Sequence, residues 1–179
     1  TPSSRWYSGS GIYRDVDLTI TDDVHVDLNG TKVTTPNLET EKGSTVNTNV
    51  TATVANDSDA AKSVAVRHTV FPKDGSADQS IGTVTTNAQS IAAGATAEIQ
   101  ATVPVSNPEL WSVENPSLYT VRTEVLVDGQ VTDTYDTEYG FRYFNFDSNT
   151  GFSLNGENMK LKGVCMHHDQ GSLGAAAYD

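Results

Sequence analysis

Cysteine, basic residues and long apolar runs are all scarce in this chain of 179 residues, and each shortage argues against a class of protein. The single cysteine, Cys165, rules out an intrachain disulfide framework. Lysine and arginine total 11 against 23 aspartate and glutamate residues, and the resulting net charge of -12 argues against nucleic acid as a partner. No apolar stretch approaches the roughly 18 residues of a membrane-spanning helix, so we expect no membrane insertion.

The first residues of the chain lack two further features. Residues 1–6 have neither the basic segment nor the apolar core of a signal peptide, and there is no initiator methionine. We therefore expect the chain to begin inside a longer protein or after processing. The abundance of threonine, serine, asparagine and alanine favours a bacterial secreted or cell-surface protein over a cytoplasmic one.

The chain is rich in segments where apolar and polar residues alternate with a period of two, which is typical of half-buried strands. Asp128-Gly129 separates two of them and is typical of a hairpin turn. The pattern predicts an all-β fold, an immunoglobulin-like antiparallel β-sandwich of roughly seven strands between residues 17 and 142. The alternating segments cover residues 46–54, 64–70, 97–105, 119–127 and 131–135.

Both ends of the chain differ from this pattern. Residues 5–14 are rich in glycine and aromatic side chains and precede the regular alternation. Near the other end, apolar residues flank Asn155-Gly156, which predicts a second hairpin. Residues 161–169 then have the pattern of a buried strand that runs directly into a histidine-rich turn.

Four short stretches occur in an order that one family shares. Residues 5–14 are RWYSGSGIYR, residues 110–119 are LWSVENPSLY, residues 140–142 are GFR, and residues 152–169 are FSLNGENMKLKGVCMHHD. Together they resemble family 2 glycoside hydrolases of the β-galactosidase type. The first resembles the end of their sugar-binding jelly roll, the next two resemble parts of their sandwich domain, and the last resembles the opening of their catalytic (β/α)8 barrel.

This resemblance implies three parts. Residues 1–16 would be the C-terminal end of the jelly-roll domain, residues 17–142 the sandwich, and residues 143–179 a linker, a hairpin and the first strand of a truncated barrel. We expect the sandwich to fold alone. A lone barrel strand has neither neighbouring strands nor covering helices, so we expect that strand not to form.

The resemblance also implies a retaining mechanism that uses two glutamates about 5 Å apart. In the family the acid/base glutamate follows an asparagine, and this chain contains no Asn-Glu dipeptide. We therefore predict no catalytic residue and no cofactor here, although some relatives bind Mg²⁺ or Na⁺ through residues beyond this segment. The full-length protein is expected to hydrolyse terminal β-D-galactosyl residues of oligosaccharides, with this segment orienting the neighbouring domains of the same chain.

The resemblance points to His167 and Asp169 as substrate-binding residues in the full-length enzyme. His167 would follow the end of the first barrel strand, where an imidazole can donate to a sugar hydroxyl and where barrel active sites form. A structural histidine at a domain junction is the alternative. Metal binding by His167, His168 and Asp169 is disfavoured, because alternate side chains diverge on an extended strand.

Other conspicuous residues have structural interpretations. We interpret Trp111 as a core or domain-interface residue rather than a sugar-stacking platform, and Arg142 as the partner of a carboxylate across the sandwich–barrel junction. Cys165 is expected to be a small residue of the barrel interior, because no base is placed to activate it. His68 alternates with valines and is expected to be a satisfied residue of the sandwich.

Two alternatives remain for the function. The first is an adhesive or carbohydrate-binding surface sandwich with no catalytic partner, against which the barrel-like stretch at residues 163–169 argues. The second keeps the family 2 enzyme but changes the sugar to a glucuronide or a mannoside.

Overall fold

The computed structural model of the chain describes residue 12 and residues 16–165. Among these, Thr21–Met159 belong to one compact unit. The described residues outside it, which are 12, 16–20 and 160–165, contain no helix or strand. The sandwich and the small sheet that follows it lie within Thr21–Met159.

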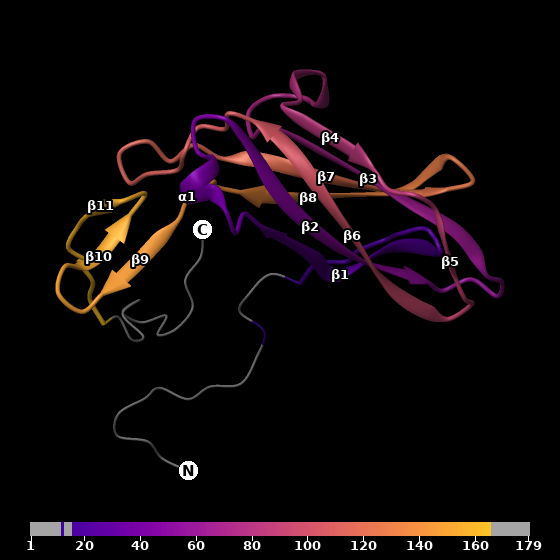
Figure 1. The fold of residues 1–179 in the computed structure, drawn as a ribbon. Helices are drawn as coiled ribbons and strands as arrows, with labels where there is room; N and C mark the ends of the chain where they lie inside the picture. Colours follow the sequence, from indigo (N-terminus) through magenta and orange to yellow (C-terminus); the bar gives the residue numbers. More distant parts are fainter. Residues whose placement is uncertain (1–11, 13–15, 166–179) are drawn as a thin grey trace, which may run out of the picture. The chain divides into compact units, whose positions relative to one another are not determined.

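Two antiparallel sheets form the sandwich (Figure 1). The first has the order β1-β2-β6, and the second has the order β4-β3-β7-β8 with β5 also paired to β3. This arrangement confirms the predicted all-β antiparallel sandwich. The strands are β1 (Val24–Thr34), β2 (Thr45–Asn56), β3 (Lys62–Pro72), β4 (Gly82–Thr85), β5 (Gln89–Ile91), β6 (Ala95–Ser106), β7 (Tyr119–Val127) and β8 (Gln130–Tyr139).

The alternating segments become the central strands. β2 and β6 pair in register from Thr45↔Ser106 to Asn56↔Ala95, so their apolar residues share the inner face. The predicted hairpin joins β7 to β8, and its turn residues Asp128 and Gly129 have φ angles of 51° and 81°. Positive φ at both positions matches the twist of the flanking strands, which explains the Asp-Gly sequence.

Strand β1 follows the alternating pattern less closely, because a bulge interrupts it. Its pairing with β2 shifts register between Val26 and Thr31. Asn29 adopts a φ of 55° within this bulge. At Gly30 a Cβ atom would lie 2.7 Å from the carbonyl oxygen of Asp27, so only glycine fits without a shift of the backbone.

The core consists largely of valines from both sheets and falls into two apolar clusters. Val66 and Val125 belong to one cluster, and Val70 and Val121 belong to the other. His68 lies between the two valines of β3 and pairs in register with Thr123 of β7, which lies between the two valines of β7. A polar pair thus occupies the positions between the clusters.

Side chains link β1 of the first sheet to β8 of the second. Thr31 Oγ1 lies 2.7 Å from Thr137 Oγ1, and Thr35 Oγ1 lies 2.8 Å from the hydroxyl oxygen of Tyr139. The backbone amide of Val26 donates to Asp133 Oδ2 at 2.9 Å. One side of the sandwich is therefore closed by side-chain hydrogen bonds rather than by a backbone ladder.

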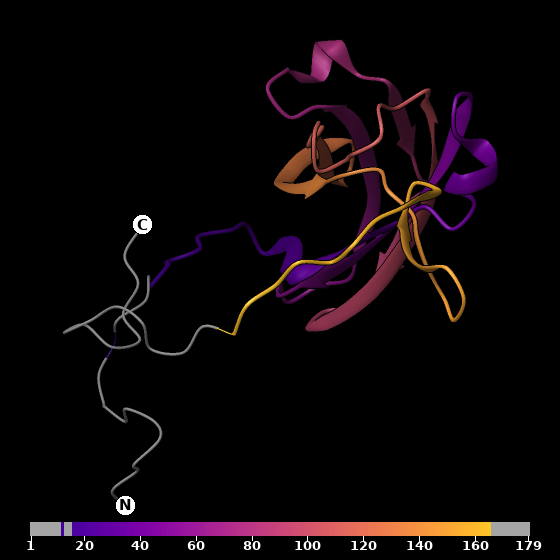
Figure 2. The same cartoon turned by 90° about the vertical axis from the view of Figure 1, so that its left-hand side faces the viewer.

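A third, small sheet of order β11-β10-β9 follows the sandwich, and Figure 2 shows it projecting as a separate hairpin. Its strands are β9 (Phe144–Asp147), β10 (Gly151–Leu154) and β11 (Glu157–Asn158). The predicted turn at Asn155-Gly156 is confirmed, with φ angles of 52° and 88°. The described helices are a single turn each, α1 (Leu38–Glu41) and the 3-10 turn Ala77–Gln79.

Candidate functional site

The predicted substrate-binding residues His167 and Asp169 lie outside the described residues and stay predictions. Just before them, residues 160–165 form no strand. Leu161, Val164 and Cys165 are exposed there. The expected barrel strand continues past the described residues and stays a prediction.

Trp111 packs against its own chain where the sandwich ends. Its backbone amide donates to the carbonyl oxygen of Phe141 at 2.8 Å, next to an isolated bridge between Leu110 and Phe141. Gly140 lies so close to the indole that an added Cβ would be 3.1 Å from Trp111 Cβ. These contacts support the interpretation of Trp111 as a structural residue rather than a sugar platform.

Arg142 contacts the same indole. Its guanidinium carbon lies 5.0 Å from the Trp111 ring centroid, within the range of a cation–π interaction. Among the residues that the structure describes, Arg142 forms no ion pair. The predicted carboxylate partner across a junction stays a prediction, and the described contact of Arg142 is with tryptophan.

Asn155 fastens the hairpin turn to the sandwich. Its Nδ2 donates to the carbonyl oxygen of Trp111 at 2.9 Å, and its Oδ1 accepts from the backbone amide of Tyr143 at 3.2 Å. Its own amide donates to the carbonyl oxygen of Tyr143 at 2.9 Å. Asparagine suits this position because it tolerates the left-handed backbone conformation. We call Trp111, Arg142, Tyr143 and Asn155 the sandwich–hairpin joint.

The joint rests on the core and on the helical turn α1. Phe141 is fully buried, and its ring contacts those of Tyr119 and Tyr139 edge-to-face at centroid distances of 5.2 and 5.1 Å. On the other side, the Lys42 ammonium donates to the hydroxyl oxygen of Tyr143 and lies 4.8 Å from its ring centroid. The joint is thus held from two directions.

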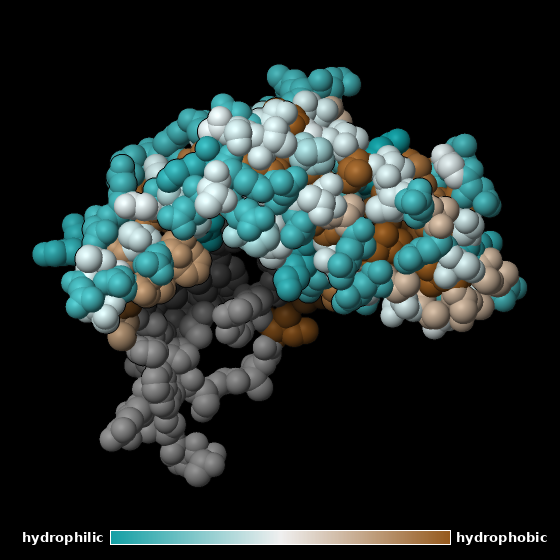
Figure 3. Space-filling view, in the orientation of Figure 1, coloured by the Kyte–Doolittle hydropathy of each residue, from teal (hydrophilic) through white to brown (hydrophobic). Residues whose placement is uncertain are grey.

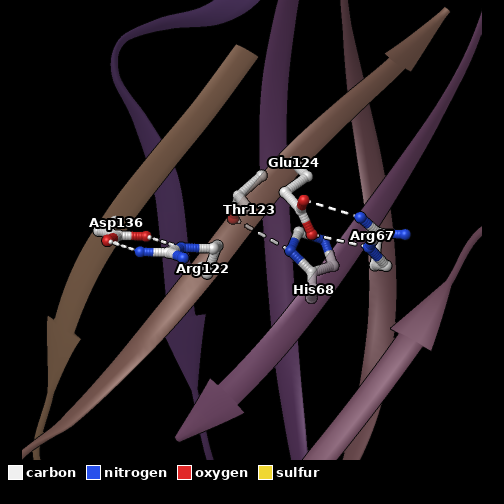
Figure 4. A network of polar contacts seen from close by, with 6 residues as sticks. All are labelled: Arg67, His68, Arg122, Thr123, Glu124 and Asp136. Carbon is white, nitrogen blue, oxygen red and sulfur yellow. Dashed lines mark hydrogen bonds and ion pairs between the residues drawn. The ribbon is translucent and has the colours of Figure 1, made fainter. Parts of the chain in front are cut away.

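Two arginine–carboxylate pairs cross the second sheet (Figure 4). Arg67 binds Glu124 through two hydrogen bonds of 2.7 Å, and Arg122 binds Asp136 through bonds of 2.8 and 2.7 Å. The hydrogen bond from Arg67 lowers the pKa of Glu124 and keeps it ionised. A glycosidase acid needs the opposite shift, so this arrangement is structural.

His68 is a sandwich residue, as predicted, but only one of its ring nitrogens is satisfied. Its side chain is 0% exposed, and Nδ1 lies 3.1 Å from Thr123 Oγ1. Nε2 is buried and has no hydrogen-bond partner among the described residues. Burial lowers the pKa of His68 to about 4, so the ring is neutral at pH 7.

Among the hollows on the surface of the described residues are two open ones of about 430 and 560 Å³. The first lies on the outer face of β1, β2 and β6 and is lined mainly by polar side chains such as Asn49 and Thr102. Glu109 lines the second, but its carboxylate accepts hydrogen bonds from Asn115 and Ser117 at 2.7 and 2.9 Å. This carboxylate holds its own loop in place.

The described part of the chain contains no group of three or more His, Cys, Asp or Glu side chains placed to hold a metal ion. Across residues 12 and 16–165, no helix is long and apolar enough to cross a membrane. These features define an antiparallel β-sandwich module with a hairpin fastened to one end.

Comparison with known proteins identifies the family. The sequence model described as "Glycosyl hydrolases family 2" matches residues 24–142, which covers β1 to β8. The chain belongs to glycoside hydrolase family 2, as the sequence resemblance predicted.

The relatives are much longer proteins. The chain is 39% identical over 175 residues to the β-galactosidase BoGH2A of Bacteroides ovatus. The aligned stretch covers 98% of this chain and 20% of that protein. A crystal structure of a family 2 member from Bacteroides cellulosilyticus matches with a TM-score of 0.85 and 35% identity, over 97% of this chain and 23% of that chain. A β-glucuronidase from Bacteroides uniformis matches with a TM-score of 0.80 and 32% identity. The match covers 94% of this chain and 20% of that chain.

Proposed function

We propose that this chain is the non-catalytic spacer domain of a retaining β-galactosidase. Family membership and the similarity to BoGH2A, which carries that name, support the sugar assignment. The chain spans about a fifth of the length of BoGH2A, so the activity belongs to the longer protein. His167 and Asp169 would bind the sugar there, once the rest of the catalytic domain is present.

The observation that carries the scaffold role is the sandwich–hairpin joint. Asn155 connects the hairpin turn to Trp111 and Tyr143 through three hydrogen bonds. A flexible tether needs no such contacts, whereas a domain that fixes the orientation of its neighbours does. Asp74 and Glu109 both line the second hollow, and the Glu109 carboxylate there accepts hydrogen bonds from Asn115 and Ser117 of its own loop.

Glucuronide specificity is the second candidate. It is supported by the likeness to the Bacteroides uniformis β-glucuronidase at 32% identity. The spacer role is the same in both cases, because it rests on the sandwich–hairpin joint and not on the identity of the sugar.

The test measures nitrophenol release from aryl β-galactoside and aryl β-glucuronide by this chain and by the full-length gene product. We expect the full-length protein to cleave the galactoside and this chain to cleave neither. Cleavage of the glucuronide alone would replace the sugar assignment. Activity of this chain would contradict the spacer role, and a full-length His167→Ala variant with unchanged KM and kcat would remove that residue from the sugar site.

A further inference from the structure

The tripeptide Leu-Asn-Gly occurs twice in the chain, at residues 28–30 and 154–156. Asparagine followed by glycine is especially prone to spontaneous deamidation, because glycine has no side chain to hinder its own backbone nitrogen. Two identical tripeptides have closely similar intrinsic reactivity. A difference between them in the folded chain must therefore come from their structural surroundings.

Deamidation needs only the chain itself and water. The backbone nitrogen of the glycine attacks Cγ of the asparagine, so that an N–Cγ bond forms and the Cγ–Nδ2 bond breaks. The side-chain nitrogen takes the proton of the glycine amide and leaves as ammonia. Water then opens the succinimide ring at either carbonyl and yields aspartate or isoaspartate. The first step requires the asparagine side chain to rotate toward the following nitrogen.

Asn29 lies in the bulge of β1, where its side chain is free to rotate. The pairing of β1 with β2 passes from Val26 directly to Thr31, so residues 27–30 have no register partner on β2. Asn29 is exposed, and its side chain forms no hydrogen bond among the described residues. Leu28 beside it is 76% exposed, so solvent surrounds this part of the bulge.

Asn155 has nearly the same φ angle but a fixed side chain. Its φ is 52°, against 55° for Asn29. Its Nδ2 donates to the carbonyl oxygen of Trp111, and its Oδ1 accepts from the backbone amide of Tyr143. Both atoms of the reacting amide are therefore held, including the nitrogen that would leave as ammonia. Rotation of the Asn155 side chain toward Gly156 would break both hydrogen bonds.

We propose that Asn29 is a deamidation site of the folded protein, and that the sandwich–hairpin joint protects Asn155 from the same reaction. The inference goes beyond the proposed function and does not depend on it. Water, which the second step consumes, reaches an exposed residue directly, and Figure 3 shows mostly hydrophilic and neutral residues on the sandwich surface in that view. The product adds a negative charge to the bulge, where no strand pairing has to change.

The test incubates this chain at mildly alkaline pH and follows the two asparagines by mass spectrometry of their peptides. The same incubation in concentrated urea provides the reference, because unfolding frees both side chains. Asn29→Gln is the control for the assignment of the site, since its longer side chain closes a ring more slowly. In that variant the peptide of the bulge should keep its amide, while Asn155 reacts as in the wild type.

In urea we expect the two sites to react at similar rates. In the folded chain Asn29 should react at least about tenfold faster than Asn155, because two hydrogen bonds must break before the Asn155 side chain can rotate. Similar rates at the two sites in the folded chain, or faster reaction of Asn155, would overturn the proposal. The same tenfold difference in urea would also overturn it, because the contrast would then come from the local sequence and not from the fold.

Discussion

Asn155 and Trp111 are 44 residues apart in the sequence, yet the side chain of the first donates to the backbone carbonyl of the second at 2.9 Å. The bond is partly buried, and it joins a hairpin turn to the loop that precedes β7. Together with Gly140 and Arg142, which contact the indole, it makes Trp111 the point where the small sheet meets the sandwich.

Replacing Asn155 should loosen the hairpin without unfolding the sandwich. Asn155→Gly keeps the positive φ but removes both side-chain hydrogen bonds, so we expect a local loss of about 1–2 kcal/mol. Asn155→Asp keeps the acceptor for Tyr143 but removes the donor to Trp111, and should give an intermediate loss. Amide exchange of β9 and β10 measures the effect. Unchanged exchange in the glycine variant would show that the joint does not hold the hairpin.

His68 should make the sandwich sensitive to acid. Its pKa is about 4 in the folded chain and 6.5 when exposed, so the unfolded chain binds more protons between these values. The free energy of unfolding should therefore fall as the pH drops from 6.5 to 4, by about 3 kcal/mol in total, and this contribution should stay constant below pH 4.

The measurement is urea unfolding of the wild type and of His68→Val across this pH range. Valine continues the pattern of β3 and does not titrate. The pKa values of Glu41, Glu124 and Asp147 are lowered by hydrogen bonds, so their contributions are lost mainly below pH 4.5 and affect both proteins equally. If the free energy of unfolding changed with pH in the same way for both proteins between pH 6.5 and 4, the acid sensitivity could not be assigned to His68.

Gly82 should not tolerate a side chain. An added Cβ would lie 2.6 Å from the carbonyl oxygen of Pro104 and 3.2 Å from Val105 Cα, where β4 passes β6. Gly82→Ala is expected to lower the free energy of unfolding by about 2 kcal/mol, because the backbone must move. Gly163→Ala is the control, since no atom of the described residues lies within 4 Å of its added Cβ. Equal melting temperatures for both variants would disprove the close approach.

The Arg67–Glu124 pair should contribute little to stability despite its good geometry. The Arg67 side chain is 38% exposed, so solvent screens the pair. A double-mutant cycle with alanine at both positions should give a coupling energy of at most about 1 kcal/mol, which decreases as salt is added. A coupling well above this value that is insensitive to salt would indicate a buried pair.

Local patterns predicted the central strands because their chemistry is local. Val46 and Val50 alternate with polar residues, and Asp128-Gly129 favours one type of turn, so neither inference needed distant residues. The bulge in β1 was harder to predict from the sequence, because Asn29 and Gly30 interrupt the alternation of apolar and polar residues.

The joint could not be predicted in this way. The asparagine of Asn155-Gly156 signalled a turn, but nothing near it in sequence indicates Trp111 as its partner. The sequence also did not predict that Phe144 and Phe146 are exposed, because the alternation of residues does not tell which face of a strand is covered. His167 and Asp169 stay predictions that depend on the family resemblance.

The side-chain bonds between β1 and β8 have a consequence for how a domain of this kind behaves in solution. Strands at the edge of a sheet expose backbone groups that recruit other chains, and natural proteins protect them. The backbone amide of Val26 donates to the Asp133 carboxylate, and the Thr132 hydroxyl donates to the carbonyl oxygen of Val24 at 2.9 Å. These backbone groups of β1 are therefore already hydrogen-bonded within the same molecule. Once β8 is in place, this side of the sandwich is thereby guarded against edge-to-edge aggregation.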